Sequence, residues 1–358
     1  MPPPETVVFR ADASPEIGIG HVMRCLALAH AWQAHGGKVV FALATGACDL
    51  ENRIRSHGVT ILIVEAVPGS SEDAARTLEI CAQSEPAWLV VDGYHFSADY
   101  LESLSTAKKR LLVIADDDEF PGCECDIMVD PNLESAQTHL RLGHQSVLLR
   151  GPAYALLRRE FLDYARLRKA IPDNAVRVLI TFGGGDLPNA SLVALRALQD
   201  IIDRDLDVTV VIGPSNRHRA ILQAAVKECR HTVRLLENVD NIPELMAHAD
   251  LAITAGGGTS YELAFMQVPM ILVPIADNQI QPANAFASAK AAITAGPLHS
   301  LNRKQLSALL GDAIRNRVLR AQLAEAARAM VDGRGAERVA QRMLAIAKGG
   351  SRRTELRN

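Results

Sequence analysis

The sequence has no strong excess of either charge and no long apolar run. Its 358 residues contain 38 Lys and Arg against 41 Asp and Glu, for a formal net charge of −3. A nucleic-acid-binding surface needs a basic stripe, which is missing outside a short tail, so we expect no nucleic-acid partner. A membrane-spanning helix needs roughly 18–20 consecutive apolar residues. No run comes near that length, so we expect no membrane span.

Cysteine is also scarce, with six residues at positions 25, 48, 81, 123, 125 and 229. So few cysteines in a chain of this length do not indicate a disulfide framework. Cys123 and Cys125 are close in sequence, but no second Cys or His pair has the spacing of a zinc site, and we expect no metal. Cys25 is either a nucleophile or a packed side chain on an apolar helix.

The two ends of the chain carry only compositional signals. Residues 1–5 lack the charged and apolar regions of a signal peptide, so we expect a cytoplasmic protein. Residues 349–358 are locally basic and are expected to be a disordered tail. No pattern in the sequence indicates a cofactor or a particular oligomeric state.

The rest of the sequence predicts two α/β domains, because its length exceeds the usual size of one core. Short apolar runs alternate with helix-period segments in both halves, as in doubly wound parallel sheets. In the first half we predict strands at 6–10, 38–43, 59–64, 88–91, 111–115 and 127–129, and helices at 22–35, 74–84 and 97–107. In the second half we predict strands at 177–182, 208–212, 233–236, 251–254 and 270–273, and helices at 191–203, 220–228, 242–247, 260–266, 280–291, 303–316 and 317–347.

These elements divide the chain into five segments. We expect an N-terminal Rossmann-like domain, a charged and helical connection, a C-terminal Rossmann-like domain, a last helix that returns to the N-terminal domain, and the tail. Their expected bounds are 1–152, 153–173, 174–330, 331–348 and 349–358.

A glycine loop between the first predicted strand and the first helix ends in His21. Gly18 and Gly20 let a ligand approach the backbone, and the helix N-terminus that follows favours negative charge. Imidazole can take up a proton near neutral pH. The loop therefore predicts chemistry on a phosphorylated ligand.

A second glycine turn, Gly256-Gly257-Gly258-Thr259-Ser260, follows a predicted strand and opens a helix. The backbone amides of such a turn can hold a diphosphate, and the Thr259 and Ser260 hydroxyls add donors. Glu262 can accept hydrogen bonds from ribose hydroxyls, or it is a carboxylate that only favours the helix dipole. No Gly-Lys-Ser/Thr sequence follows, which excludes a P-loop.

A third glycine turn, Gly183-Gly184-Gly185, also lies between a predicted strand and a helix. The alternative to ligand binding is a helix-start turn capped by Asp186 or Asn189. Two glycine turns at equivalent places in one domain favour phosphate binding.

Polar side chains follow several other predicted strands. Asp277, Asn278 and Gln279 can hydrogen-bond a sugar, or the first two cap a helix. Tyr94 follows a strand of the first half and is a candidate substrate contact. The triplet 116–118 is either a divalent-cation site or a solvated acidic loop.

Together these motifs resemble a known family. The chain is similar to the UDP-sugar hydrolases of pseudaminic acid biosynthesis, which release UDP from UDP-2,4-diacetamido-2,4,6-trideoxy-β-L-altropyranose and are relatives of the glycosyltransferases that make lipid II. The resemblance spans about residues 6–345 and rests on segments 9–12, 18–24, 130–133, 151–161, 182–186, 256–263 and 275–279.

The resemblance implies an α/β GT-B fold, two Rossmann-like domains with a cleft between them, in which the C-terminal domain binds most of UDP. It implies that His21 activates water, that Tyr94 and Asn278 lie near the sugar, that Glu262 binds the ribose, and that Val239 backbone atoms contact uracil. The matched motifs add further candidate substrate-binding residues: Arg10, Gly18, Gly20, Arg24, Asp277 and Gln279. We also expect Asp12 to orient His21 as a catalytic partner.

The sequence departs from the family pattern at several positions. The family usually has serine at position 258, often has serine at 185, and commonly reads Asp-His-Tyr where this chain has Asp92-Gly93-Tyr94. At residues 115–118 the family has a more apolar sequence than the acidic one of this chain. Because backbone amides bind a diphosphate, the glycine turns keep their expected role. The residues expected to face the sugar are the ones that differ from the family pattern.

The expected reaction is hydrolysis of a UDP-sugar to UDP and the free sugar. UDP is a good leaving group, so the enzyme needs mainly a positioned water, a base and donors for the diphosphate. One alternative is a GT-B glycosyltransferase that uses the same donor, although no apolar or basic amphipathic patch near the start of the chain would dock a lipid acceptor. The other alternative is a non-catalytic UDP-sugar-binding protein.

Overall fold

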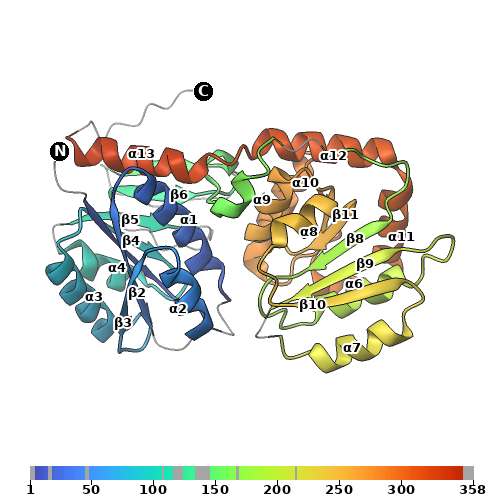
Figure 1. Ribbon diagram of the computed structural model, residues 1–358, viewed down its shortest axis with the longest axis horizontal. Helices are drawn as coiled ribbons and strands as arrows, with labels where there is room; N and C mark the ends of the chain where they lie inside the picture. Colours follow the sequence, from blue (N-terminus) through green and yellow to red (C-terminus); the bar gives the residue numbers. More distant parts are fainter. Residues whose placement is uncertain are drawn as a thin grey trace. The chain divides into compact units, whose positions relative to one another are not determined.

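The computed structural model describes residues 5–14, 18–44, 48–106, 109–115, 124–133, 146–166, 169–213 and 216–349. The chain divides into two compact units. Unit 1 consists of residues 1–159 and 334–358, and unit 2 consists of residues 160–333. Each unit is built on its own parallel sheet with helices on its faces (Figure 1).

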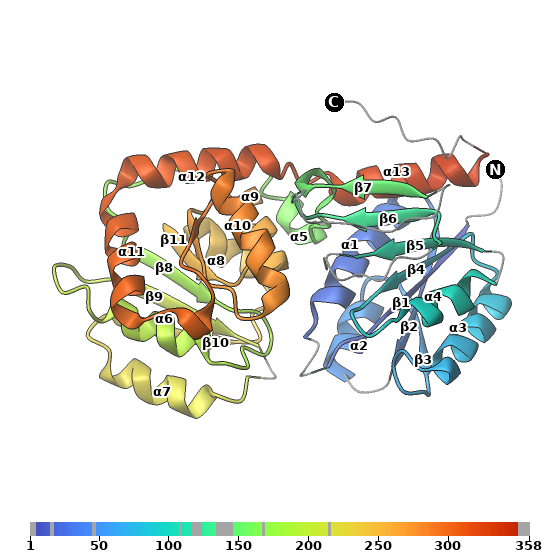
Figure 2. The same cartoon turned by 180° about the vertical axis from the view of Figure 1, so that it is seen from behind.

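The sheet of unit 1 has seven strands in the order β3-β2-β1-β4-β5-β6-β7, all parallel. Figure 2 shows β6 and β7 at one edge of this sheet. The strands are β1 (Thr6–Ala11), β2 (Lys38–Ala44), β3 (Thr60–Val64), β4 (Trp88–Asp92), β5 (Arg110–Ile114), β6 (Ile127–Asp130) and β7 (Val147–Arg150).

Apolar side chains alternate between the two faces of this sheet, as a period of two requires. Val7 and Phe9 of β1 enter one core cluster, and Val8 enters the other. Because both faces are covered, the strands are apolar throughout rather than alternating with polar residues. The helices of unit 1 are α1 (Gly20–Ala34), α2 (Cys48–Arg55), α3 (Ser71–Ser84), α4 (Ala98–Ser105) and α13 (Gly335–Ala347), with the short η1 (Pro152–Tyr154) after β7.

The last helix of the chain, α13, is part of unit 1. Val339 and Met343 of α13 are fully buried in the same core cluster as Leu26 and Trp32 of α1. At the first residue of the helix, a Cβ on Gly335 would lie about 2.2 Å from the Ala155 carbonyl oxygen. Glycine therefore allows α13 to pack directly on the backbone that follows β7.

The sheet of unit 2 has six parallel strands in the order β10-β9-β8-β11-β12-β13. They are β8 (Arg177–Thr181), β9 (Asp207–Ile212), β10 (Thr232–Glu237), β11 (Leu251–Thr254), β12 (Met270–Leu272) and β13 (Ile293–Thr294). The helices are α6 (Ala190–Leu198), α7 (Arg219–Glu228), α8 (Ile242–His248), α9 (Gly258–Phe265), α10 (Ile280–Ser288), α11 (Arg303–Arg315) and α12 (Arg317–Met330), with short turns η2 (Asp277–Gln279) and η3 (Leu298–Ser300).

Several details differ from the sequence expectations. The single helix predicted at 317–347 is two helices, α12 and α13, which belong to different units, and α2 was not predicted. The edge strands β7 and β13 were not predicted; β13 has only two residues and is defined by its pairing with β12. The connection at 153–173 is mostly non-helical, because its described part holds only the end of η1 and the four-residue α5 (Arg159–Leu162). One of its charged side chains makes a contact with another element: the Lys169 ammonium donates to the Met246 and Ala247 carbonyls at the end of α8.

Among the described residues, no helix is long and apolar enough to cross a membrane. The acidic triplet at 116–118, Cys123 and the basic tail from residue 350 onward lie outside the described residues.

Candidate functional site

In unit 1, His21 lies in the first turn of α1, directly after the glycine loop. Gly18 has φ +77°, a left-handed conformation that favours glycine, and its N–H donates to the Ser14 carbonyl at 2.7 Å. No side chain caps α1, whose preceding residue Ile19 makes no capping hydrogen bond. The residue before α1 thus supplies no side-chain acceptor to the first amide groups of the helix.

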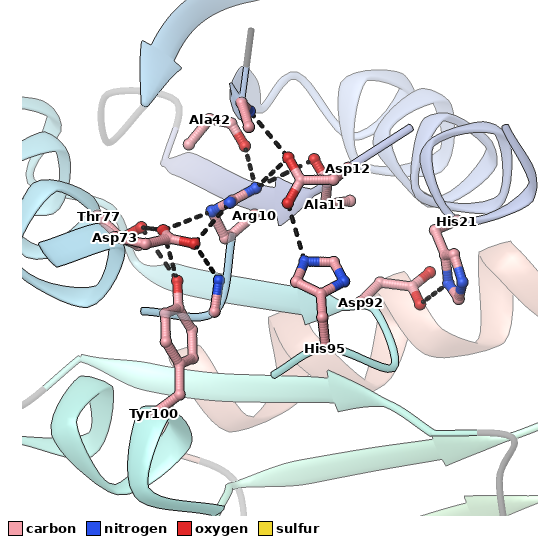
Figure 3. Close-up of polar contacts among 12 residues, drawn as sticks. Arg10, Ala11, Asp12, His21, Ala42, Asp73, Thr77, Asp92, His95 and Tyr100 are labelled. Carbon is pink, nitrogen blue, oxygen red and sulfur yellow. Dashed lines mark hydrogen bonds and ion pairs between the residues drawn. The ribbon is translucent and has the colours of Figure 1, made fainter. Parts of the chain in front are cut away.

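His21 is paired with a carboxylate, that of Asp92. Its Nδ1 lies 2.7 Å from Asp92 Oδ1, and both side chains are buried (Figure 3). An ionised carboxylate only accepts hydrogen bonds, so Nδ1 carries the proton and Nε2 of a neutral His21 keeps its lone pair. This is the arrangement that prepares an imidazole to act as a general base.

Asp92 ends β4, where it is held by several groups. Arg24 of α1 donates to both of its oxygens at 2.6 Å. Burial alone would raise the pKa of Asp92, but the Arg24 charge and the His21 contact hold that pKa well below its usual range. Asp92 therefore stays ionised, and Arg24, expected to bind substrate, is bound to this carboxylate.

Cys25 lies beside the same carboxylate, with its Sγ 3.5 Å from Asp92 Oδ2. It is fully buried, and burial together with the negative charge of Asp92 raises the pKa of its thiol. A protonated, enclosed thiol is a poor nucleophile. Of the two alternatives for Cys25, packing is the one that the structure supports.

Asp12 does not orient His21, which corrects the sequence expectation. Its Oδ1 accepts from the Arg10 guanidinium at 2.6 Å and from the Ala44 N–H at 2.8 Å. Its Oδ2 lies 2.9 Å from Nε2 of a different histidine, His95. Because Asp12 follows β1 and Asp92 ends the neighbouring β4, the two carboxylates lie at the carboxyl ends of adjacent strands. Each one binds its own imidazole (Figure 3).

Arg10 is not placed to bind substrate, which is a second correction. Its side chain is 0% exposed, and the guanidinium donates to both oxygens of Asp73 at 2.9 and 2.7 Å as well as to Asp12. Asp73 also accepts from the Tyr100 and Thr77 hydroxyls. A buried charge needs such partners. Arg10 therefore joins β1 to α3 and α4 inside unit 1.

Tyr94 follows Asp92 and lies next to the candidate base. Its ring meets that of His21 edge-on, with 4.7 Å between the centroids and 82° between the planes. The side chain is 53% exposed. Tyr94 therefore combines direct contact with His21 and access from outside, which suits the expected substrate contact.

Two polar residues of this site, Asp92 and His95, were missing from the sequence-derived set. Asp92 had a usable signal, since it ends a buried strand that neighbours β1, which leads to the glycine loop. His95 had none, because its bond to Asp12 depends on the fold of the loop after β4.

In unit 2, the expected ligand-binding loops meet at one edge of the sheet. Thr254 at the end of β11 is in register with Thr181 at the end of β8 and with Leu272 at the end of β12. In a parallel sheet, aligned ends place the following loops side by side. The turns Gly183–Gly185 and Gly256–Gly258 and the Asp277–Gln279 segment therefore share this edge.

At two glycines in and beside these loops, the backbone of another loop comes too close to leave room for a Cβ atom. A Cβ on Gly256 would lie about 2.5 Å from the Gln279 carbonyl oxygen, and the Gln279 side chain accepts from the Ile275 N–H at 3.0 Å. A Cβ on Gly213, after β9, would lie about 2.4 Å from the Gly184 carbonyl oxygen. In contrast, a Cβ on Gly184 or Gly258 would meet nothing within 4 Å. These two glycines face open space.

The side chains of the two glycine turns have different roles. Ser260 is buried and its hydroxyl donates to the Gly257 carbonyl at 2.6 Å, so its single proton is used in the turn. This corrects the expectation that Ser260 donates to a ligand. Asp186 accepts from the Ala190 and Ser191 N–H groups and caps α6, as the alternative interpretation has it. Burial raises the pKa of Asp186.

The remaining predicted residues lie on elements at the same edge. Thr259 and Glu262 are partly exposed on α9, while Asp277 and Asn278 lie in η2, where no side chain makes a capping hydrogen bond. Val239 lies in the loop after β10 and follows Asn238, which has φ +50°. Across the described parts of both units, no group of three or more His, Cys, Asp or Glu side chains is arranged to hold a metal ion.

Comparison with known proteins shows which sequences and structures the chain is similar to. The chain is 24% identical, over 78% of its length and 96% of the relative, to the UDP-2,4-diacetamido-2,4,6-trideoxy-beta-L-altropyranose hydrolase of Campylobacter jejuni. The resemblance to this hydrolase family is confirmed. Residues 179–342 match the glycosyltransferase family 28 C-terminal domain, which agrees with the expected glycosyltransferase relatives.

Two further similarities concern the fold and the length of the chain. The expected GT-B fold is confirmed by a crystal structure of MurG from Acinetobacter baumannii, which covers 95% of this chain and 99% of that one, with a TM-score of 0.67 and 17% identity. A protein of Methanocaldococcus jannaschii, MJ1062, is 24% identical over 75% of this chain. That match spans 55% of the relative's own length. The similarity to a nucleotide-sugar hydrolase and to family 28 supports a UDP-sugar-processing enzyme.

Proposed function

We propose that the chain hydrolyses a UDP-activated deoxy-diacetamido sugar, UDP-2,4-diacetamido-2,4,6-trideoxy-β-L-altropyranose, as a step of pseudaminic acid biosynthesis. The observation that carries the proposal is the His21–Asp92 pair, which leaves Nε2 of an enclosed imidazole as a proton acceptor beside the exposed Tyr94. The similarity to the Campylobacter jejuni hydrolase supports the choice of substrate.

In the proposed reaction, His21 activates a water molecule. The water oxygen attacks the anomeric carbon while its proton moves to His21 Nε2. The bond between the anomeric carbon and the β-phosphate oxygen breaks, and UDP leaves with the electron pair. Asp92 stabilises the imidazolium that forms. General-base assistance of this kind contributes on the order of 10²–10⁴-fold to the rate.

We propose that unit 2 binds UDP through backbone amides. The open faces of Gly184 and Gly258 and the first N–H groups of α9 support diphosphate binding, because a helix N-terminus attracts anions. In this proposal Glu262 accepts from the ribose hydroxyls and Val239 backbone atoms bind uracil. Tyr94 and Asn278 contact the sugar.

The decisive experiment replaces the base. A His21→Ala variant should lose on the order of 10²–10⁴-fold in UDP release and keep its affinity for UDP, since His21 is in unit 1 and the diphosphate loops are in unit 2. His35→Ala is the matched control, because His35 ends the same helix and its imidazole lies 3.1 Å from the Glu337 carboxylate, away from the Asp92 pair. Full turnover by His21→Ala would remove His21 from the mechanism.

A glycosyltransferase is the second candidate, favoured by the family 28 match over residues 179–342. It would use the same donor and base, with an alcohol in place of water. Assaying UDP release with and without alcohol acceptors separates the candidates. A hydrolase releases equal amounts of UDP and free sugar in buffer alone, a transferase needs the acceptor, and a binding protein releases neither.

A further inference from the structure

Unit 1 contains a second carboxylate–imidazole pair, Asp12 with His95, that the proposed reaction does not use. His95 Nε2 lies 2.9 Å from Asp12 Oδ2. Asp12 is buried, whereas the His95 side chain is 20% exposed, so a ligand can reach the ring. Figure 3 shows this pair beside the pair formed by Asp92 and His21.

The contacts of Asp12 fix which His95 nitrogen is free to accept. Burial alone would raise the pKa of Asp12, but the contacts with His95 and Arg10 lower it to about 2, so the group is an acceptor. His95 Nε2 must therefore carry the proton, and Nδ1 of the neutral ring has a lone pair. None of the described residues forms a hydrogen bond with that Nδ1.

The position of the His95 ring is set by the backbone that joins it to the candidate base. A Cβ on Gly93 would lie about 2.7 Å from His95 Cε1 and about 3.1 Å from Nδ1. Only glycine leaves room for the ring there. Gly93 lies between Asp92 and Tyr94, which both contact His21. His95 Nδ1 thus lies close to Gly93, in the loop after β4 whose neighbouring residues contact His21.

We propose that His95 is a substrate-positioning residue, whose Nδ1 accepts a hydrogen bond from an N–H or O–H group of the sugar. The inference rests on the proposed function for the nature of the ligand, because a diacetamido sugar carries amide N–H donors. A site built around a fixed acceptor discriminates against sugars that lack the matching donor. Asp12 acts through His95 by holding its tautomer and orientation.

Two substitutions of His95 separate ligand binding from structural support. In His95→Gln the terminal amide nitrogen takes the approximate place of Nε2, so the bond to Asp12 is kept and the Nδ1 acceptor is lost. In His95→Asn the amide oxygen takes the approximate place of Nδ1, so the acceptor is kept and the Asp12 bond is lost. Thermal unfolding of both variants reports whether the fold is retained.

The measurement is the affinity for the UDP-sugar relative to that for UDP, by calorimetry in a His21→Ala background that prevents hydrolysis. We expect His95→Gln to weaken UDP-sugar binding on the order of 3- to 10-fold, the value of one hydrogen bond, with UDP binding unchanged. His95→Asn should retain most of the sugar affinity. Normal affinity in the Gln variant together with a loss in the Asn variant would show a structural role only and overturn the proposal.

The kinetic readout tests the choice between positioning and proton transfer. With His21 intact, His95→Gln should raise KM and leave kcat within a few-fold of the original. A loss of kcat on the order of 10²-fold at unchanged KM would make His95 a base and overturn its positioning role. If the original chain fails to release UDP but its sugar affinity still depends on His95, the proposed hydrolysis fails while this inference holds.

Discussion

The two units differ in what they place at the carboxyl ends of their central strands. At the ends of β1 and β4, unit 1 gathers charged side chains, among them Asp12 and Asp92, in an interior where each has a named partner. At the ends of β8 and β11, unit 2 has glycine turns whose open positions, Gly184 and Gly258, have no side chain at all. Parallel strands align their carboxyl ends in both units, but one unit places buried, paired side chains there and the other places open backbone.

This difference indicates how each unit tolerates substitution. In unit 1 the chemistry depends on the identity of an atom, such as the Asp92 oxygen that accepts from His21. In unit 2 the expected ligand contacts depend on the space that glycine leaves and on amide groups that every residue possesses. Substitutions in unit 1 should therefore be harmful when they change the hydrogen-bonding capacity of a side chain. Substitutions in unit 2 should be harmful when they add a side chain where the backbone is closely approached, as at Gly256.

The largest effect is expected for Asp92→Asn. An amide nitrogen facing His21 Nδ1 would donate to it, which places the imidazole proton on Nε2 and removes the base. We expect kcat to fall on the order of 10²–10⁴-fold with UDP affinity unchanged. Steady-state kinetics and calorimetry with UDP measure the two quantities.

Asp250→Asn is the matched control for this substitution. Asp250 is a buried carboxylate of unit 2 that binds the Arg177 guanidinium at 2.6 Å and two backbone N–H groups. Its loss should lower the unfolding temperature while kcat changes little. If Asp250→Asn lowered kcat as strongly as Asp92→Asn, general destabilisation rather than the tautomer of His21 would explain both results.

The sequence predicted the parts of the fold that depend on local pattern. The apolar runs of β1, β4, β8 and β11 mark two parallel sheets because both faces of these strands are buried. The two-residue β13 escaped prediction, since it is a strand only through its pairing with β12. The charged segment 153–173 resembled a helix, but one of its charges, the Lys169 ammonium, binds carbonyl groups of α8.

The candidate site was predicted in part for the same reason. His21 and the glycine turns are recognisable because a glycine loop before a helix has a local meaning. The partner of His21 is not local: Asp92 is 71 residues away, and the nearer Asp12 is engaged by Arg10 and His95. Strand order decides this pairing, because β1 lies between β2 and β4 in the sheet.

An intermediate effect is expected from adding one methyl group in unit 2. In Gly256→Ala the new Cβ would meet the Gln279 carbonyl oxygen at about 2.5 Å, and this is backbone that must shift. We expect a loss of roughly 1–3 kcal/mol in the free energy of unfolding, as for other overpacked sites, and a weaker affinity for UDP. Denaturant unfolding and calorimetry check both values.

Gly258→Ala provides the comparison within the same turn. Its Cβ would meet nothing within 4 Å, and the residue begins α9, where alanine is favourable. The free energy of unfolding should stay within about 0.5 kcal/mol or rise slightly. Equal destabilisation by both substitutions would contradict the idea that close approach at Gly256, rather than glycine flexibility, shapes this edge.

The smallest effect is expected in how the free energy of unfolding changes with pH when Asp12 is replaced. Because the folded-state pKa of Asp12 lies at about 2, below its usual value, this carboxylate adds stability at neutral pH that is lost as the pH falls through 4 toward 2. The part lost between pH 7 and pH 3 is about 1 kcal/mol. Asp12→Asn should lack this part, so its unfolding free energy should fall less steeply over the same range. An identical acid slope would mean that Arg10 and His95 do not lower the pKa of Asp12, and the contrast between charged side chains in unit 1 and backbone in unit 2 would lose its electrostatic basis.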